Sequence, residues 1–200
     1  MDIFCYLIID EASKSAAVID PAFDTGKIIA CLSERGMKLT HIINTHGHAD
    51  HTAGNAAIQK ATQAKLALHR EDLPHLKGLL HKTFSFFLGG QGSPLPDLLL
   101  EDGDTLWVGG IRLLVLHTPG HTRGSLSIYT EGHVFTGDTL FVGGVGRTDL
   151  PGGSHGELVS SIQRKIYTLP DQTLVWPGHD YGPTPHSTVG REKAENPYTR

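Results

Sequence analysis

Four side chains that can bind metal ions lie within six consecutive positions of this sequence: His46, His48, Asp50 and His51 in the stretch Asn-Thr-His-Gly-His-Ala-Asp-His at 44–51. In a tight turn, residues two positions apart project to the same side, so His46 and His48 can share one ion. Asp50 and His51 can then serve a second ion. Three imidazoles and a carboxylate crowded together without a metal would leave polar groups poorly satisfied. The spacing therefore predicts a metal-binding loop.

Three more potential ligands each lie in a glycine- or proline-rich turn after an apolar run, at His121, Asp138 and His179. Strands commonly present functional groups from such turns. Zinc usually takes four ligands, and a catalytic zinc site keeps one position for water. We therefore expect a dinuclear centre, in which Asp138 bridges two ions. The other ligands are His46, His48 and His121 for the first ion, and Asp50, His51 and His179 for the second.

Two such ions about 3.5–4 Å apart polarise a carbonyl group and lower the pKa of a bound water toward about 7. This is the chemistry of a hydrolase. Zinc is the first choice, with iron or manganese as alternatives, because histidine and carboxylate ligands accept all three metals.

The composition of the 200-residue chain limits its partners. Its net charge is −4 with neutral histidines, and its Lys and Arg residues are scattered, which argues against nucleic acid as a partner. Cys5 and Cys31 form no Cys-x-x-Cys pair, so neither a disulfide framework nor a thiolate zinc site is indicated. No stretch approaches the ~20 apolar residues of a membrane span, and the first ten residues lack the features of a signal peptide. We expect a cytoplasmic protein with no membrane partner.

The elements expected around the ligands alternate between strands and helices in both halves of the chain, which is an α/β pattern. This duplicated order suggests a single domain over residues 1–200 that has two sheets face to face and helices outside. Residues 76–104 mix bulky apolar residues with Gly and Pro and form a variable insert, expected as a short helix plus a loop. The insert is a pocket wall, a subunit contact or a packed connector, so homo-oligomerisation stays open. The expected strands are 3–9, 16–19, 40–45, 65–69, 105–108, 111–118, 125–130, 133–138 and 173–179, and the expected helices are 25–35, 52–62, 154–168 and 189–196.

Five motifs together resemble the metallo-β-lactamase superfamily: VIDPAF, THGHADH, PGHT, GDTLF and PGHDYG occur in the family's order over nearly the whole chain. The resemblance implies an αββα sandwich of two mixed sheets, with the metals at one edge of the sheets. It also implies that Asp20, in the first motif, binds no metal but holds a ligand of the histidine loop in its orientation. Asp138 occupies the bridging position, where true β-lactamases carry Cys or another residue, so antibiotic hydrolysis is not expected.

The stretches FVGGVGRTDLPGGSH and HSTVGREKAENPYTR resemble the short bacterial glyoxalase II-like proteins. The resemblance implies hydrolysis of a small-molecule, glutathione-type thioester such as S-D-lactoylglutathione. A hydroxide that bridges the metals, oriented by Asp50, would attack the thioester carbonyl. Arg147 and Tyr181 correspond to positions at which glyoxalase II contacts glutathione. Arg147 replaces the usual Lys, and Asp149 falls where an aromatic residue is usual.

Two alternatives remain open. The first is a glutathione persulfide dioxygenase, a related branch that uses one ferrous ion and a triad of two histidines and one carboxylate. Here the triad would be His46, His121 and Asp138. The second is a metal-binding or partner-binding scaffold without catalytic activity, for which the apolar insert would be an interface.

Overall fold

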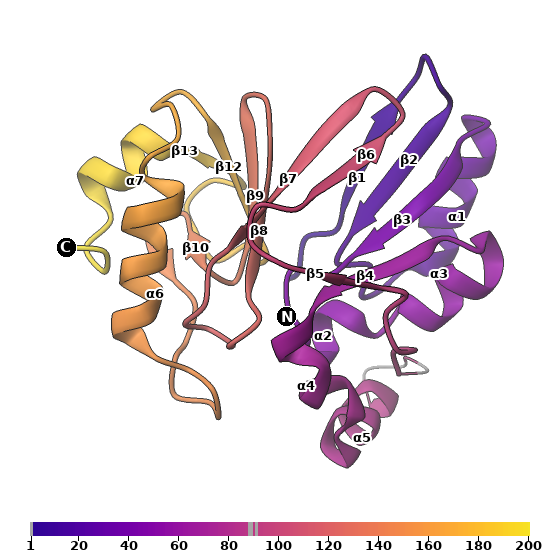
Figure 1. Cartoon of the computed structure of the whole chain (residues 1–200), viewed down its shortest axis with the longest axis horizontal. Coiled ribbons are helices and arrows are strands. Elements are labelled where there is room, and N and C mark those ends of the chain that lie inside the picture. Colours follow the sequence, from indigo (N-terminus) through magenta and orange to yellow (C-terminus); the bar gives the residue numbers. More distant parts are fainter. Residues whose placement is uncertain (1, 88–89, 91) are drawn as a thin grey trace. The chain divides into compact units, whose positions relative to one another are not determined.

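The protein is described from a computed structural model, which covers residues 2–87, 90 and 92–200. The chain divides into two compact units. The N-terminal unit comprises residues 5–100 and 106–112, and the C-terminal unit comprises residues 1–4, 101–105 and 113–200. Mixed sheets with helices against them make up the chain, which confirms the α/β class (Figure 1). The single domain over residues 1–200 and the face-to-face packing of the sheets stay predictions.

The sheet of the N-terminal unit has five strands in the order β1-β2-β3-β4-β5. β1 pairs antiparallel with β2, and the remaining neighbours are parallel. Because β2, β3 and β4 run parallel, the segments that follow them leave the same edge of the sheet. The strands are β1 (Tyr6–Asp10), β2 (Ser15–Ile19), β3 (Lys38–Ile43), β4 (Lys65–His69) and β5 (Leu98–Leu100).

Helices α1 (Thr25–Glu34) and α3 (Asn55–Thr62) cover one face of this sheet (Figure 1). Leu32 of α1 and Ile58 of α3 are buried in one apolar cluster with Val18 of β2 and other strand residues. The helix predicted over 52–62 is α3, which begins three residues later than predicted, and a separate short helix, α2 (Ala49–Thr52), precedes it inside the histidine stretch.

The insert contains more regular structure than expected. It holds α5 (Leu79–Phe87) and β5, and α4 (Leu73–Lys77) precedes and overlaps its start, following the 3₁₀ turn η1 (Arg70–Asp72). A strand of three leucines has too short a pattern to be distinguished from a loop in the sequence. Phe84, Phe86 and Phe87 of α5 are exposed. The expected roles of the insert as a pocket wall or subunit contact stay predictions, and its positions 88, 89 and 91 lie outside the described residues.

The larger sheet has six strands in the order β13-β12-β9-β8-β7-β6. β12 and β9 are parallel, whereas β9 with β8, β8 with β7 and β12 with β13 are antiparallel. β10 (Leu140–Phe141) and β11 (Gly144–Val145) form a separate hairpin that was not predicted. The strands of the larger sheet are β6 (Thr105–Val108), β7 (Ile111–His117), β8 (Leu126–Thr130), β9 (His133–Gly137), β12 (Leu174–Pro177) and β13 (Ser187–Thr188).

The helices of the C-terminal unit lie together (Figure 1): α6 (His155–Ser161), its π-helical continuation η2 (Ile162–Ile166) and α7 (Val189–Glu195). Leu158 and Ile162 pack with Val175 of β12 in one buried cluster. The helix predicted over 154–168 therefore exists, but its second half is widened to a π-turn. No helix in the part of the chain described by the structure has the length and apolar character needed to cross a membrane.

Candidate metal centre

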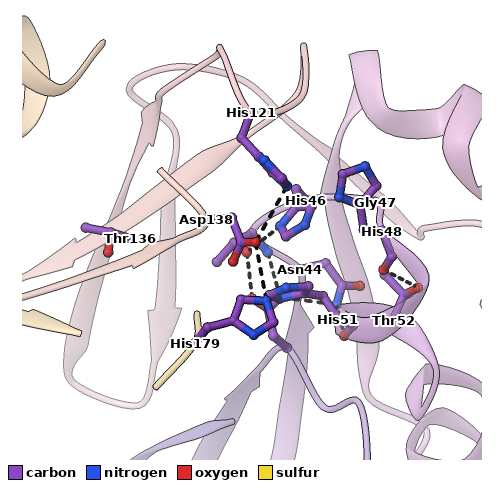
Figure 2. Close-up of polar contacts among 12 residues, drawn as sticks. Asn44, His46, Gly47, His48, His51, Thr52, His121, Thr136, Asp138 and His179 are labelled. Carbon is purple, nitrogen blue, oxygen red and sulfur yellow. Dashed lines mark hydrogen bonds and ion pairs between the residues drawn. The ribbon is translucent and has the colours of Figure 1, made fainter. Parts of the chain in front are cut away.

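The histidine loop, residues 44–51, follows β3 and continues into α2. The carboxyl ends of β2 and β3 are tied together at this point, because the Asp20 N–H donates to the Ile43 carbonyl at 3.0 Å. Asn44 closes the loop: its Nδ2 donates to the carbonyl of His51 at 3.2 Å. His46 and His51 are buried, with ring centroids 4.0 Å apart, and Figure 2 shows both rings in this loop. The local chain path thus brings the rings of His46 and His51 together, and the predicted sharing of ions stays a prediction.

Asp20 lies behind the loop and is 2 % exposed. Its Oδ1 accepts the Thr45 N–H at 2.8 Å, and its Oδ2 accepts the Thr45 hydroxyl at 2.6 Å. His51 Nδ1 also donates to Oδ2, at 3.0 Å. A carboxylate that accepts three such bonds is well compensated for its burial.

These bonds determine which ring nitrogens face outward. Nδ1 of His51 must carry its proton to donate to the Asp20 carboxylate, so Nε2 keeps its lone pair. The Thr45 hydroxyl donates to Asp20 and can therefore only accept from His46 Nδ1, 3.2 Å away, which leaves the Nε2 lone pair of His46 outward as well. Hydrogen bonding of one ring nitrogen is the arrangement that prepares the other for a metal. The role expected for Asp20 stays a prediction, and these contacts are compatible with it.

His48 and Asp50 lie at the start of α2. His48 precedes the helix, and its carbonyl accepts the Thr52 hydroxyl at 3.0 Å (Figure 2). Its ring meets the ring of His46 edge-on, with centroids 4.8 Å apart. Asp50 lies in α2, which consists of a single turn. Both side chains are half-buried.

In the C-terminal unit, Asp138 follows β9 and His179 follows the neighbouring parallel strand β12. The two ends are tied by the Gly178 N–H, which donates to the Gly137 carbonyl at 2.8 Å. His179 Nε2 lies 3.3 Å from Asp138 Oδ2. Parallel pairing thus places a carboxylate and an imidazole at one sheet edge.

His121 approaches the same carboxylate from the turn after β7, with Nε2 3.6 Å from Asp138 Oδ2 (Figure 2). The preceding residue, Gly120, has a φ of +134°, and an added Cβ there would collide with the backbone of Leu158. His121 Nδ1 donates to the carbonyl of Arg147 at 2.7 Å. This bond places the ring proton on Nδ1 and leaves the Nε2 lone pair facing the carboxylate.

The donor chemistry of both groups fits a divalent cation. A bound cation would attract both the Nε2 lone pair of His121 and the carboxylate of Asp138. Imidazole nitrogens and carboxylate oxygens suit zinc, iron and manganese. In the N-terminal unit, ligand atoms of His46, His51 and Asp20 lie within 4.8 Å of one another, but the oxygens of Asp20 already accept from Thr45 and His51, and Asp20 is not one of the predicted ligands. The seven predicted ligands therefore fall into two groups, four in one unit and three in the other.

Arg147 and Tyr181 have other contacts in the C-terminal unit. Arg147 forms a two-point pair with Asp149, through Nε and Nη2 at 2.7 Å each. This hydrogen-bonded guanidinium lowers the pKa of Asp149 to about 2, so the pair persists at all pH values well above that. Tyr181 stacks on His179 with ring centroids 4.7 Å apart and an interplanar angle of 3°. The side chain of Tyr181 is nevertheless 61 % exposed.

The sequence did not predict the residues that support the candidate ligands. Buried hydroxyls of Thr118 and Thr139, 3.0 Å apart, connect the turn before His121 to the turn after Asp138. Asp72, fully buried after β4, accepts the Gly47 N–H at 2.7 Å. Asp72 follows the predicted strand 65–69, just as the expected ligands follow predicted strands, and this position could have identified it.

Comparison with known proteins gives the family. A family model described as the metallo-beta-lactamase superfamily matches residues 1–179. The chain belongs to this superfamily. The human mitochondrial persulfide dioxygenase ETHE1 is 36 % identical over 197 residues, which are 97 % of this chain and 70 % of that protein. The hydroxyacylglutathione hydrolase GloC of Haemophilus influenzae is 33 % identical over 198 residues, 97 % of this chain and 91 % of that protein.

Solved structures of similar chains agree with the superfamily fold. The di-iron-bound form of TTHA1623 matches with a TM-score of 0.83 and 35 % identity, over 97 % of this chain and 93 % of that one. BLEG-1, named a B3 metallo-β-lactamase, matches with a TM-score of 0.86 and 33 % identity, over 98 % and 93 % of the two chains. The metallo-β-lactamase fold predicted from the motifs is thereby confirmed.

The comparisons indicate an enzyme with His and Asp clusters suited to metal. Because BLEG-1 is named a β-lactamase, the expectation that this chain does not hydrolyse antibiotics stays a prediction. The cytoplasmic location, the homo-oligomer and the absence of a nucleic-acid or membrane partner also stay predictions.

Proposed function

We propose that this superfamily member hydrolyses a small-molecule thioester of a glutathione-type thiol, such as S-D-lactoylglutathione, with two divalent ions as cofactors. The name of the GloC relative supports this substrate class, and the di-iron form of TTHA1623 supports two metals. In the proposed centre Asp138 would serve both ions. His46, His48 and His121 would hold one ion, and Asp50, His51 and His179 would hold the other.

The observation that carries the proposal is the hydrogen bond from His51 Nδ1 to the buried carboxylate of Asp20, at 3.0 Å. A mononuclear triad of His46, His121 and Asp138 makes no use of His51. In this chain His51 is fully buried and its Nε2 is prepared as a ligand, which a dinuclear hydrolase requires.

The chemistry supplied by two bound ions is a water made acidic and a polarised thioester carbonyl. The chain's own groups orient the reactants. Asp50, in the first turn of α2, would accept a hydrogen bond from the water and orient it toward the carbonyl carbon. Arg147 and Tyr181 are proposed to contact the thiol portion of the substrate. The guanidinium would bind a carboxylate of that portion, and the exposed ring of Tyr181 would pack against its apolar atoms.

The deciding experiment measures metals per chain together with activity on two substrates, S-D-lactoylglutathione and glutathione persulfide. We expect about two metal ions per chain and thioester hydrolysis. His51→Ala should lose one ion and most hydrolysis, roughly 10²-fold or more, because the second ion loses a ligand. His155→Ala, at an exposed position of α6, is the matched control and should behave as the native protein.

Asp138→Ala tests the shared ligand. Loss of the bridging carboxylate should remove activity and most of the bound metal, since both ions depend on it. Glu131→Ala, an exposed carboxylate in the turn between β8 and β9, is the control. Near-native turnover by Asp138→Ala would contradict both enzymatic functions.

The second candidate is a mononuclear iron dioxygenase that acts on glutathione persulfide. The relative ETHE1, named a persulfide dioxygenase, favours it with 36 % identity, compared with 33 % for GloC. One iron per chain, oxygen uptake with glutathione persulfide and an active His51→Ala variant would establish this function and overturn the hydrolase.

A further inference from the structure

Asp72 occupies a place on the histidine loop that mirrors the place of Asp20. The loop follows β3, the central one of three parallel strands. Asp20 follows β2 on one side of β3, and Asp72 follows β4 on the other side, at the end of the turn η1. Both carboxylates are buried, and both accept backbone N–H groups of the loop, Asp20 from Thr45 and Asp72 from Gly47.

The contact made by Asp72 is at the residue between two expected ligands. Asp72 Oδ2 accepts the Gly47 N–H at 2.7 Å, and Gly47 separates His46 from His48. The chain is tightly packed there, because a Cβ added to Gly47 would meet His75 Cβ at 3.0 Å and the Asp72 carbonyl oxygen at 3.1 Å. A displacement of Gly47 would therefore move both histidines.

His75 extends this support to the ring of His48. It lies in α4, one turn after Asp72, and its Nε2 is 4.0 Å from Asp72 Oδ1. The rings of His75 and His48 meet edge-on, with centroids 5.2 Å apart and an interplanar angle of 81°. The ring of His48 thus contacts the rings of both His46 and His75.

A fully buried carboxylate is costly unless its hydrogen bonds are worth more than its lost hydration. If Asp72 only stabilised the fold, any hydrogen-bond partner would suffice. Asp72 instead binds Gly47, the residue between His46 and His48, and His75 contacts the His48 ring. These contacts would fix the positions of the two proposed ligands. Metal ligands must be held to about 0.5 Å for full affinity.

We propose that Asp72 is a positioning residue of the metal centre, which sets His46 and His48 through the Gly47 backbone, and that His75 sets the His48 ring. The proposal rests on the metal centre of the proposed function but not on its substrate. Asp20 and Asp72 would then hold the histidine loop from its two sides.

The test measures metal binding without substrate, by titrating apo protein with Zn²⁺ against a chromophoric chelator and by recording the spectrum of the Co²⁺ form. Asp72→Ala should weaken binding of the ion proposed to lie at His46 and His48 by about 10- to 100-fold, the usual cost of losing a group that orients a ligand. Asp72→Asn should recover most of this loss, because the amide oxygen still accepts the Gly47 N–H. His75→Ala should change the Co²⁺ spectrum.

Asp97→Ala is the matched control. Asp97 is an exposed carboxylate of the same unit whose Oδ2 accepts the Leu66 N–H of β4 at 2.9 Å, away from the histidine loop. Its loss should lower thermal stability and leave Zn²⁺ affinity unchanged.

A purely structural Asp72 would give a different result: lower apo stability for Asp72→Ala but native Zn²⁺ affinity in the folded protein, which would overturn the proposal. If Asp72→Ala does not fold, the test relies on His75→Ala and Asp72→Asn. A native Co²⁺ spectrum for His75→Ala together with weakened Zn²⁺ binding by Asp72→Asn would overturn the proposal. A native protein that binds metal but hydrolyses no thioester would reject the proposed function and leave this inference standing.

Discussion

The two groups of proposed metal ligands are held by different means. In the N-terminal unit, a buried carboxylate holds the histidine loop, because Asp20 accepts from His51 Nδ1 and from the Thr45 hydroxyl. In the C-terminal unit, the corresponding bond of His121 goes to a backbone carbonyl, that of Arg147. Both bonds leave Nε2 for a metal, but only the first depends on the identity of the supporting side chain.

The difference has a consequence for tolerance to mutation. A single substitution can remove Asp20, whereas no substitution removes the carbonyl of Arg147. That carbonyl can only be displaced, by crowding the segment that carries it. Gly146 offers this possibility, since a Cβ there would collide with the carbonyl of Asp138 and lie 3.2 Å from His121 Nδ1. The two groups should therefore fail in different ways.

Asp20→Asn should have the largest effect of the three substitutions that follow. An amide NH₂ facing His51 Nδ1 forces that nitrogen to accept, so the ring proton moves to Nε2 and blocks metal binding there. We expect the second ion to bind about 10- to 100-fold more weakly, and the apo protein to lose about 1–3 kcal/mol because buried partners are left mismatched. Metal titration and denaturant unfolding measure the two effects. Full retention of both ions would refute the assigned role of Asp20.

Gly146→Ala should have the next largest effect, on the group held by the backbone. The added methyl group must push the Arg147 segment away from Asp138, at a cost of about 1–3 kcal/mol in unfolding free energy. His121 then loses its bond to the Arg147 carbonyl, and metal affinity should fall with it. Gly156→Ala, where a Cβ would meet nothing within 4 Å, is the control and should retain both properties. If Gly146→Ala and Gly156→Ala had the same stability and metal affinity, the Arg147 segment would accommodate the methyl group without displacing His121, and the prediction would be wrong.

Asp149→Asn should have the smallest effect. The Asp149 carboxyl has its pKa lowered to about 2 by Arg147, so their pair is present above the ordinary pKa of 3.8 and is lost only as the pH falls toward 2. Both side chains are more than 60 % exposed. Removing the negative charge should lower the KM for a glutathione thioester by roughly 1.5- to 5-fold, the range of an exposed ion pair. High salt should reduce this change.

Arg147→Ala is the complementary variant and should raise the same KM. If neither variant alters KM at low salt, Arg147 has no part in binding the substrate.

Much of the fold was predictable because its signals are local. β4 was placed correctly at residues 65–69, since an apolar run between polar residues suffices. The features that were missed are short or depend on packing: the three-residue strand β5, the β10–β11 hairpin and the π-turn η2. Their sequences carry too few residues for a period to emerge.

The sequence by itself determined the chemistry of the histidine loop, because His46, His48, Asp50 and His51 lie so close together that any compact path of the chain gathers them. It also indicated that the other three ligands follow strands. Tertiary structure decided what supports them. The contact between His51 and Asp20 joins residues 31 positions apart, and the contact between Gly47 and Asp72 spans 25. Such pairs exist only once parallel strands bring their carboxyl ends to one edge of a sheet, and no local pattern records which distant side chain will arrive there.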